Sequence, residues 1–204
     1  DYKSNNWQEN TLSELRRTSL LTLGVIGAGR IGGSIIRKAK AIGFNTVFYD
    51  PYRDRGYEKM LSSERSESLD CLLKISDIVS INTPLTDKTK SMVNANFLSK
   101  MKDGSALINT ARGEIISNLD IFIDPLKSGS ICGLGLDVIP KEPPENCEFI
   151  RAWKQREEWI AGRVIINPHT SYYTLDSYKE MRVKAAQNAL RILKDEPPYN
   201  IIEI

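Results

Sequence analysis

The most constraining feature of this sequence is an apolar stretch that runs through a glycine-rich turn into a helical pattern. Positions 20–26 are mostly apolar, as in a strand buried on both faces. Gly27, Gly29 and Gly32 follow in the spacing G-x-G-x-x-G, and 34–42 is typical of a helix. In such a run the first glycine permits a tight turn, the second admits a pyrophosphate, and the third lets helix and strand pack closely. The run therefore predicts a dinucleotide phosphate site at the start of a helix.

An acid ends the next predicted strand, 45–50, about 20 residues after the glycine-rich turn. A carboxylate at Asp50 can accept hydrogen bonds from the adenine-ribose hydroxyls and repels a 2′-phosphate. Two plainer interpretations remain open: the glycines serve turn chemistry alone, and Asp50 is a turn or N-cap acid before Pro51. The combination favours NAD as the cofactor.

Composition argues against several other classes of protein. Lys and Arg number 28 against 26 Asp and Glu, a net charge of +2, so no nucleic-acid or anionic-membrane surface is expected. Three cysteines without C-x-x-C indicate neither a disulfide framework nor a zinc site, and they suit a reducing cytoplasm. No apolar run approaches the ~20 residues of a membrane span, and no signal peptide is visible. The chain begins with Asp1 rather than Met, which suggests a fragment.

Strand and helix patterns alternate along the chain, which predicts an α/β fold with a doubly wound parallel sheet, Rossmann-like in class. The predicted strands cover 20–26, 45–50, 76–82, 106–109, 133–138 and 163–167. The predicted helices cover 34–42, 68–75, 94–101, 118–127, 148–161 and 174–194. The charged stretch 51–67 is predicted to be a connecting loop, and Pro125 to distort its helix.

Three parts are expected along the chain. A polar lead-in segment, 1–19, has Trp7 as its large apolar anchor and a short helical turn at 11–15. A dinucleotide-binding domain follows over 20–173, and a returning helix with a tail occupies 174–204.

Several polar groups come directly after predicted strands. Thr83, the segment 110–112, Asp137 and His169 all stand at such positions. In doubly wound sheets ligands bind beyond the carboxyl ends of the strands, so parallel strands would bring these groups to one edge.

Three side chains suit the reduction of a 2-oxo acid. His169, the single histidine, has an unperturbed pKa suited to proton exchange near neutrality. Arg112 offers a planar two-pronged donor for a carboxylate. Glu142 could hydrogen-bond the imidazole, fix its tautomer and raise its pKa. The plainer alternatives are a structural histidine, a surface ion-pair arginine and a surface acid in a proline-rich loop.

Taken in order, these motifs resemble the D-isomer-specific 2-hydroxyacid dehydrogenase family. The matching stretches are 27–32, 49–51, 83–86 with Thr89, 109–113, 136–138, 142–143 and 168–169. Within the family, 48–52 is similar to the C-terminal-binding-protein branch. The stretch 169–174 is similar to D-lactate dehydrogenases and their vancomycin-resistance relatives.

The resemblance implies a role for each matched position. Arg112 would bind the substrate carboxylate and carbonyl, His169 would be the acid/base, and Glu142 its partner. Bound NAD would contact Gly27, Gly29, Arg30, Ile31 and Gly32 at the pyrophosphate, Asp50 at the adenine ribose, Thr83, Pro84 and Thr89 on the adenosine side, and Thr110, Ala111 and Asp137 at the nicotinamide, with Arg112 and His169 beside it.

The chain departs from the family pattern in two places. The segment between Arg112 and Asp137 is slightly longer than usual, and the given sequence starts almost at the nucleotide domain, so we expect it to lack the substrate-binding part that precedes this domain in the family. We therefore expect a truncated NAD-binding domain of an oxidoreductase that acts on a small D-2-hydroxy acid or 2-oxo acid, homodimeric when complete. The alternative is a non-catalytic, NAD-responsive interaction protein of corepressor type. The retained Arg112, Glu142 and His169 favour the enzyme.

Overall fold

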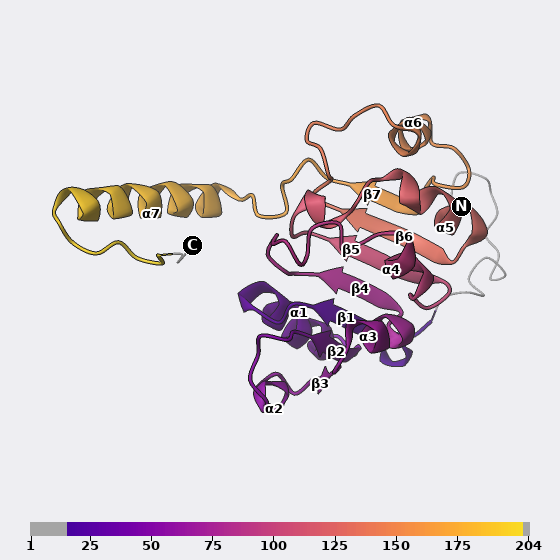
Figure 1. Cartoon of the computed structure of the whole chain (residues 1–204), viewed down its shortest axis with the longest axis horizontal. Coiled ribbons are helices and arrows are strands. Elements are labelled where there is room, and N and C mark those ends of the chain that lie inside the picture. Colours follow the sequence, from indigo (N-terminus) through magenta and orange to yellow (C-terminus); the bar gives the residue numbers. More distant parts are fainter. Residues whose placement is uncertain (1–15, 202–204) are drawn as a thin grey trace. The chain divides into compact units, whose positions relative to one another are not determined.

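The computed structural model describes residues 16–201, which form two compact units (Figure 1). The first unit ends at Asn167 and the second begins at Pro168, six positions before the predicted boundary at 173/174. Trp7 and the turn expected at 11–15 lie outside the described residues. The three-part division expected from the sequence stays a prediction.

One seven-stranded sheet, with all strands parallel, forms the centre of the first unit (Figure 1). Its strands are β1 (Thr22–Ile26), β2 (Asn45–Tyr49), β3 (Glu64–Arg65), β4 (Ile78–Ile81), β5 (Ser105–Asn109), β6 (Ile131–Leu136) and β7 (Val164–Ile166). The spatial order is β3-β2-β1-β4-β5-β6-β7, so the direction of winding reverses between β1 and β4. The predicted doubly wound parallel sheet is confirmed.

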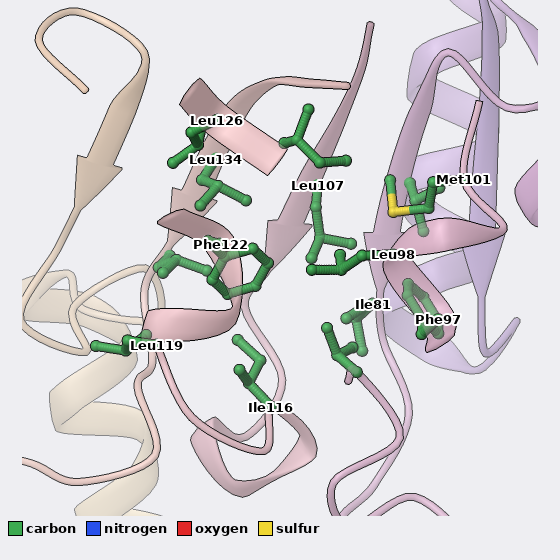
Figure 2. Packing of buried hydrophobic residues seen from close by; sticks show 14 of the residues in the cluster. Ile81, Phe97, Leu98, Met101, Leu107, Ile116, Leu119, Phe122, Leu126 and Leu134 are labelled. Atoms are coloured by element: carbon green, nitrogen blue, oxygen red, sulfur yellow. The ribbon is translucent and has the colours of Figure 1, made fainter. Parts of the chain in front are cut away.

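Helices cover both faces of this sheet. They are α1 (Arg30–Ala41), α2 (Tyr57–Leu61), α3 (Leu69–Ile75), α4 (Ala95–Ser99), α5 (Ile123–Ser128) and α6 (Glu148–Gln155), with 3₁₀ turns η2 (Thr18–Leu20), η3 (Gly113–Ile115) and η4 (Asp120–Phe122). Successive strand residues face opposite sides, so Val47 packs in a cluster with α3 to α6 and Phe48 in a cluster with α1 and α2. Figure 2 shows part of the larger cluster, where side chains of α4, η4 and α5 lie among those of the strands.

The prediction that 51–67 is a plain loop is wrong, because α2 and β3 lie within it. Leu61 is buried in the smaller cluster, and Tyr57 places its ring edge-on to Phe48. The short strand β3 pairs with β2 at the sheet edge, where few residues are buried. Contacts with residues distant in sequence, rather than a periodic apolar pattern, stabilise these elements, so the charged local sequence did not predict them.

Several predicted helices also differ in extent from the structure. The helix expected over 34–42 is α1 (Arg30–Ala41), and the one expected over 94–101 is α4 (Ala95–Ser99). The stretch 118–127 is divided into η4 and α5, and Pro125 falls in the first turn of α5, where its missing N–H is tolerated. The helix expected over 148–161 ends at Gln155, because Arg156 adopts a left-handed conformation with φ 56°.

The second unit consists of a short lead-in, the helix α7 (Leu175–Leu193) and a tail that folds back on it. The helix begins at a capping box in which Thr174 and Ser177 exchange hydrogen bonds. The Arg191 guanidinium lies 4.2 Å from the ring centroid of Tyr199 in the tail. Between residues 16 and 201, no helix has the length and apolar character that crossing a bilayer would require.

Candidate cofactor and active site

The glycine-rich turn lies at the point where the winding of the sheet reverses, between β1 and β4. Gly27 has φ +88°, and a Cβ there would come 2.7 Å from the carbonyl oxygen of Asn82. A Cβ at Gly32 would come 1.9 Å from the carbonyl oxygen of Gly27. Both distances are far inside van der Waals contact with backbone, so the protein itself requires glycine at these two positions. The predicted tight turn and close helix packing are confirmed.

Gly29 is a different case. It has φ −75°, and a Cβ there would meet only Arg53 Nη2, at 3.5 Å, which is an ordinary contact. Gly29 is the N-cap of α1, whose first turn has neither a side-chain cap nor an acid. The leading N–H groups of a helix have no intrahelical partner and favour an anion. The unpartnered N–H groups at this end of α1 thus suit a phosphate, and at Gly29 only Arg53 would come within 4 Å of an added Cβ.

A pocket of about 630 Å³ adjoins this turn and is lined from both sides of the reversal point. Of the predicted cofactor residues, its wall contains Gly27, Gly29, Asp50, Thr83, Pro84 and Thr89. The sequence analysis did not predict the contributions of Tyr52, Arg53, Leu69, Lys88 and Met92. Pockets of this volume accommodate small organic ligands.

Asp50 is held firmly in the wall of this pocket and is only 9% exposed. Its Oδ2 accepts a hydrogen bond from the Ala28 N–H at 2.9 Å, and its Oδ1 accepts one from the Tyr52 N–H at 3.0 Å. Arg53 Nε lies 3.5 Å from Oδ2. A carboxylate has about four acceptor positions, so Asp50 retains the capacity to accept from ribose hydroxyls.

The opposite wall, after β4, contains two consecutive residues whose side-chain oxygens have no partner within the described residues. Asn82 Oδ1 and Thr83 Oγ1 are among the four buried side-chain oxygens that lack a hydrogen-bond partner within the described residues. Buried polar atoms normally have partners, and both residues line the pocket. The hydroxyl of Thr89, in contrast, donates to the Pro84 carbonyl at 2.7 Å and so closes its own loop. The residues present therefore fit a dinucleotide.

The second part of the site lies at the carboxyl end of β5. Asn109 is fully buried; its Nδ2 donates to the Arg112 carbonyl at 3.0 Å, and its Oδ1 accepts from the Ala111 N–H at 3.0 Å. These bonds hold Thr110, Ala111 and Arg112 in one conformation, with the Arg112 side chain exposed. The sequence analysis noted Asn109 as part of a motif but missed this positioning role.

The loop after β6 packs directly against the Arg112 loop. A Cβ at Gly113 would come 1.8 Å from the carbonyl oxygen of Ile139, so glycine is required for this approach. Glu142 Oε1 accepts a hydrogen bond from the Ile139 N–H at 3.2 Å, and Asp137 is 5% exposed at the end of β6. The first unit thus brings the loops of Arg112 and Glu142 together.

His169 belongs to the second unit. It has φ 55°, and its ring lies edge-on to Tyr172 with centroids 6.2 Å apart. Its approach to Arg112 and Glu142 stays a prediction.

A family model described as "D-isomer specific 2-hydroxyacid dehydrogenase, NAD binding domain" matches residues 1–171. A glyoxylate reductase of Korarchaeum cryptofilum is 33% identical over 182 residues, which cover 89% of this chain and 52% of that protein. A D-3-phosphoglycerate dehydrogenase of Methanocaldococcus jannaschii is 30% identical over 183 residues, covering 90% of this chain and 33% of that protein. The chain thus spans about half or less of these relatives' length.

Solved structures show the same similarity. The D-lactate dehydrogenase of Aquifex aeolicus, solved with NAD and lactic acid, superposes with a TM-score of 0.82 at 32% identity. The match covers 96% of this chain and 60% of that one. The D-mandelate dehydrogenase of Rhodotorula graminis gives a TM-score of 0.75 at 34% identity over 88% of this chain and 50% of that one.

Proposed function

The chain belongs to the D-isomer-specific 2-hydroxyacid dehydrogenase family, through its NAD-binding domain, and on that premise we propose that it serves an oxidoreductase. The reaction is hydride transfer between NAD(H) and a small D-2-hydroxy acid or 2-oxo acid. The observation that carries the proposal is the pocket at the reversal point, whose lining combines Gly29 and Asp50 with Asn82 and Thr83, two residues with unpartnered side-chain oxygens.

Each wall of the pocket has a role in holding the cofactor. The first turn of α1, from Arg30 and Ile31, binds the pyrophosphate through its N–H groups. Asp50 accepts hydrogen bonds from the adenine ribose and disfavours a 2′-phosphate by charge repulsion. The hydroxyl of Thr83 and the amide oxygen of Asn82 gain partners when the pocket is filled.

Catalysis is assigned to the carboxyl ends of the later strands. Bound NADH supplies the hydride. Arg112 binds the substrate carboxylate through its guanidinium, whose Nη1 here donates to the Ala111 carbonyl at 2.7 Å, while Asn109 holds the backbone carbonyl of Arg112. His169 donates a proton to the carbonyl oxygen during reduction, and Glu142 stabilises the imidazolium. Thr110, Ala111 and Asp137 position the nicotinamide side.

The relatives described above carry enzyme names, which favours the enzyme over the interaction protein of corepressor type. The proposed substrate is a small 2-oxo acid. The roles given to Arg112, Glu142 and His169 involve its carboxylate and carbonyl groups and do not specify its side chain. A homodimer, a cytoplasmic location and the absence of nucleic-acid and membrane partners stay predictions.

A cofactor titration tests the first part of the proposal. When the 204-residue chain is titrated with NADH, the change in NADH fluorescence is expected to saturate, and NADPH is expected to bind more weakly. Equal or tighter binding of NADPH would contradict the role given to Asp50.

Turnover of a panel of small 2-oxo acids by the natural gene product tests the second part. His169→Asn is expected to lower kcat by roughly 10²–10⁴, the usual size of a general acid/base contribution, while NADH binding stays unchanged. Glu142→Gln is expected to shift the pH profile of reduction to lower pH. A wild-type pH profile in Glu142→Gln would refute the pairing.

A further inference from the structure

We propose that Arg53 is a direct ligand of the adenosine-side phosphate of the bound dinucleotide, an inference that rests on the proposed NAD site. Its Nη2 lies 3.5 Å from the point that a Cβ of Gly29 would occupy. Arg53 thus borders the backbone at the N-cap of α1, which a pyrophosphate approaches in a glycine-rich turn of this kind. A phosphate that accepts hydrogen bonds from the first N–H groups of α1 comes next to Gly29 and therefore close to the Arg53 guanidinium.

The Arg53 side chain is held in place by neighbours on two sides. Its Nε lies 3.5 Å from Asp50 Oδ2, and its guanidinium carbon lies 5.1 Å from the ring centroid of Tyr57. Tyr57 is itself anchored edge-on to the buried Phe48. These contacts direct the terminal nitrogens of Arg53 toward the glycine-rich turn while the side chain remains 40% exposed.

The backbone around Arg53 is also fixed, by a second arginine. Arg65 Nη1 donates to the carbonyl oxygens of Arg53 and Asp54 at 2.9 and 3.1 Å, and Arg65 Nη2 donates to that of Asp50 at 3.3 Å. Three carbonyls of one loop thus share one guanidinium. This arrangement lowers the entropic cost of presenting Arg53 to a ligand.

Charge balance supports the assignment. The first turn of α1 contributes partial positive charge but no acid, and Asp50 places a negative charge next to the phosphate path. Arg53 lies between them and offsets the repulsion between Asp50 and a pyrophosphate. The pair therefore separates two tasks, with Asp50 facing the ribose and Arg53 the phosphate.

Arg55 offers a matched control in the same loop. It pairs with Glu67 at 3.3 Å, and its side chain is 82% exposed. It is absent from the wall of the pocket. Arg55→Gln removes the same charge from the same segment without touching the proposed contact.

The test is calorimetric titration of the 204-residue chain, Arg53→Gln and Arg55→Gln with adenosine, 5′-AMP, 2′-AMP, ADP-ribose and NADH. Arg53→Gln is expected to weaken the phosphate-bearing ligands by on the order of tenfold, since a hydrogen bond to a charged group is lost. Adenosine is expected to bind unchanged, and Arg55→Gln to behave as wild type. Higher salt is expected to weaken the binding of ADP-ribose less in Arg53→Gln than in wild type.

Three outcomes would overturn the proposal. One is unchanged binding of ADP-ribose by Arg53→Gln. Another is a loss of affinity for adenosine in Arg53→Gln that equals the loss for the phosphate-bearing ligands, which would mean that the substitution disturbs the pocket itself. The third is a selective loss for 2′-AMP over 5′-AMP, which means that Arg53 contacts a 2′-phosphate. If the wild-type chain binds neither NADH nor ADP-ribose, the proposed NAD site fails as well, whereas wild-type binding with an unaffected variant refutes the role of Arg53 alone.

Discussion

Asp50 and Asp77 lie at opposite edges of the same sheet, the edges formed by the carboxyl ends and the amino ends of its strands. The two carboxylates have different surroundings. The side chain of each is only 11% exposed. Asp77 precedes β4, at the amino ends of the strands, whereas Asp50 follows β2, at the carboxyl ends.

At the amino edge, the donors around Asp77 come from three separate segments. Arg16 Nη1 and Lys102 Nζ lie 2.8 and 2.6 Å from Oδ1, and the Thr22 N–H donates to Oδ2 at 2.8 Å. Burial by itself raises the pKa of Asp77, but the hydrogen bonds from Lys102, Thr22 and Arg16 outweigh it and hold this pKa below its ordinary value. Asp77 therefore joins β1, β4 and the entry to β5 and contributes to stability.

At the carboxyl edge, Asp50 accepts two backbone hydrogen bonds and has one cation, Arg53, at 3.5 Å, and it faces a pocket. The difference teaches that burial of an acid does not by itself mark a functional site. Donors of the protein itself surround the carboxylate of Asp77, whereas a pocket lies beside the carboxylate of Asp50.

The largest expected effect comes from two glycines of the glycine-rich turn, Gly32 and Gly29. Gly32→Ala is expected to lower the free energy of unfolding by roughly 3–5 kcal/mol, because its Cβ would meet the Gly27 carbonyl oxygen at 1.9 Å. Gly29→Ala is expected to cost about 1 kcal/mol or less yet to weaken NADH binding strongly. Urea denaturation and NADH titration measure both. Similar stability losses in the two variants would remove the distinction between packing and ligand glycines.

Exchanging each acid for its amide tests the comparison directly. Asp77→Asn is expected to lower the free energy of unfolding by about 1–3 kcal/mol, since buried donors lose a charged acceptor, without changing the Kd for NADH. Asp50→Asn is expected to weaken NADH on the order of tenfold with the smaller loss of stability. A stability loss at Asp50 that exceeds the one at Asp77 would contradict the assignment of the two edges.

Acid titration of stability sharpens the comparison further. The folded pKa of Asp77 lies below its unfolded value, so its contribution is present above the unfolded pKa and is lost as pH falls through the folded pKa. We expect the free energies of unfolding of wild type and Asp77→Asn, measured from pH 7 down to about pH 3, to diverge below about pH 4. In that range wild type loses more stability than Asp77→Asn. Parallel curves for the two proteins would show that the carboxylate contributes nothing.

The smallest effect is expected at Thr83. Its Oγ1 is buried and has no partner within residues 16–201, so Thr83→Val is expected to leave the melting temperature unchanged or slightly raised. NADH is expected to bind a few-fold more weakly, because the hydroxyl gains its partner from the ligand. A clear drop in melting temperature would show that the hydroxyl serves the fold.

Some of this protein follows from local sequence alone. Gly27 and Gly32 predicted a tight turn and a close helix contact, and backbone oxygens at 2.7 and 1.9 Å confirm both. Alternating strand and helix patterns predicted the parallel sheet, because buried parallel strands need short apolar runs and helical crossovers. These features depend on neighbouring residues, whose periodicity the sequence displays.

Other features were decided only by the tertiary structure. The segment 51–67 forms α2 and β3 because it packs on β2 and Phe48, and its charged sequence contains no periodic signal for this. Arg53 and Arg55 are equivalent in sequence, yet one lies beside Gly29 and the other pairs with Glu67. Side-chain roles of this kind arise where segments distant in sequence meet, so the folded sheet, and not the local pattern, determines them.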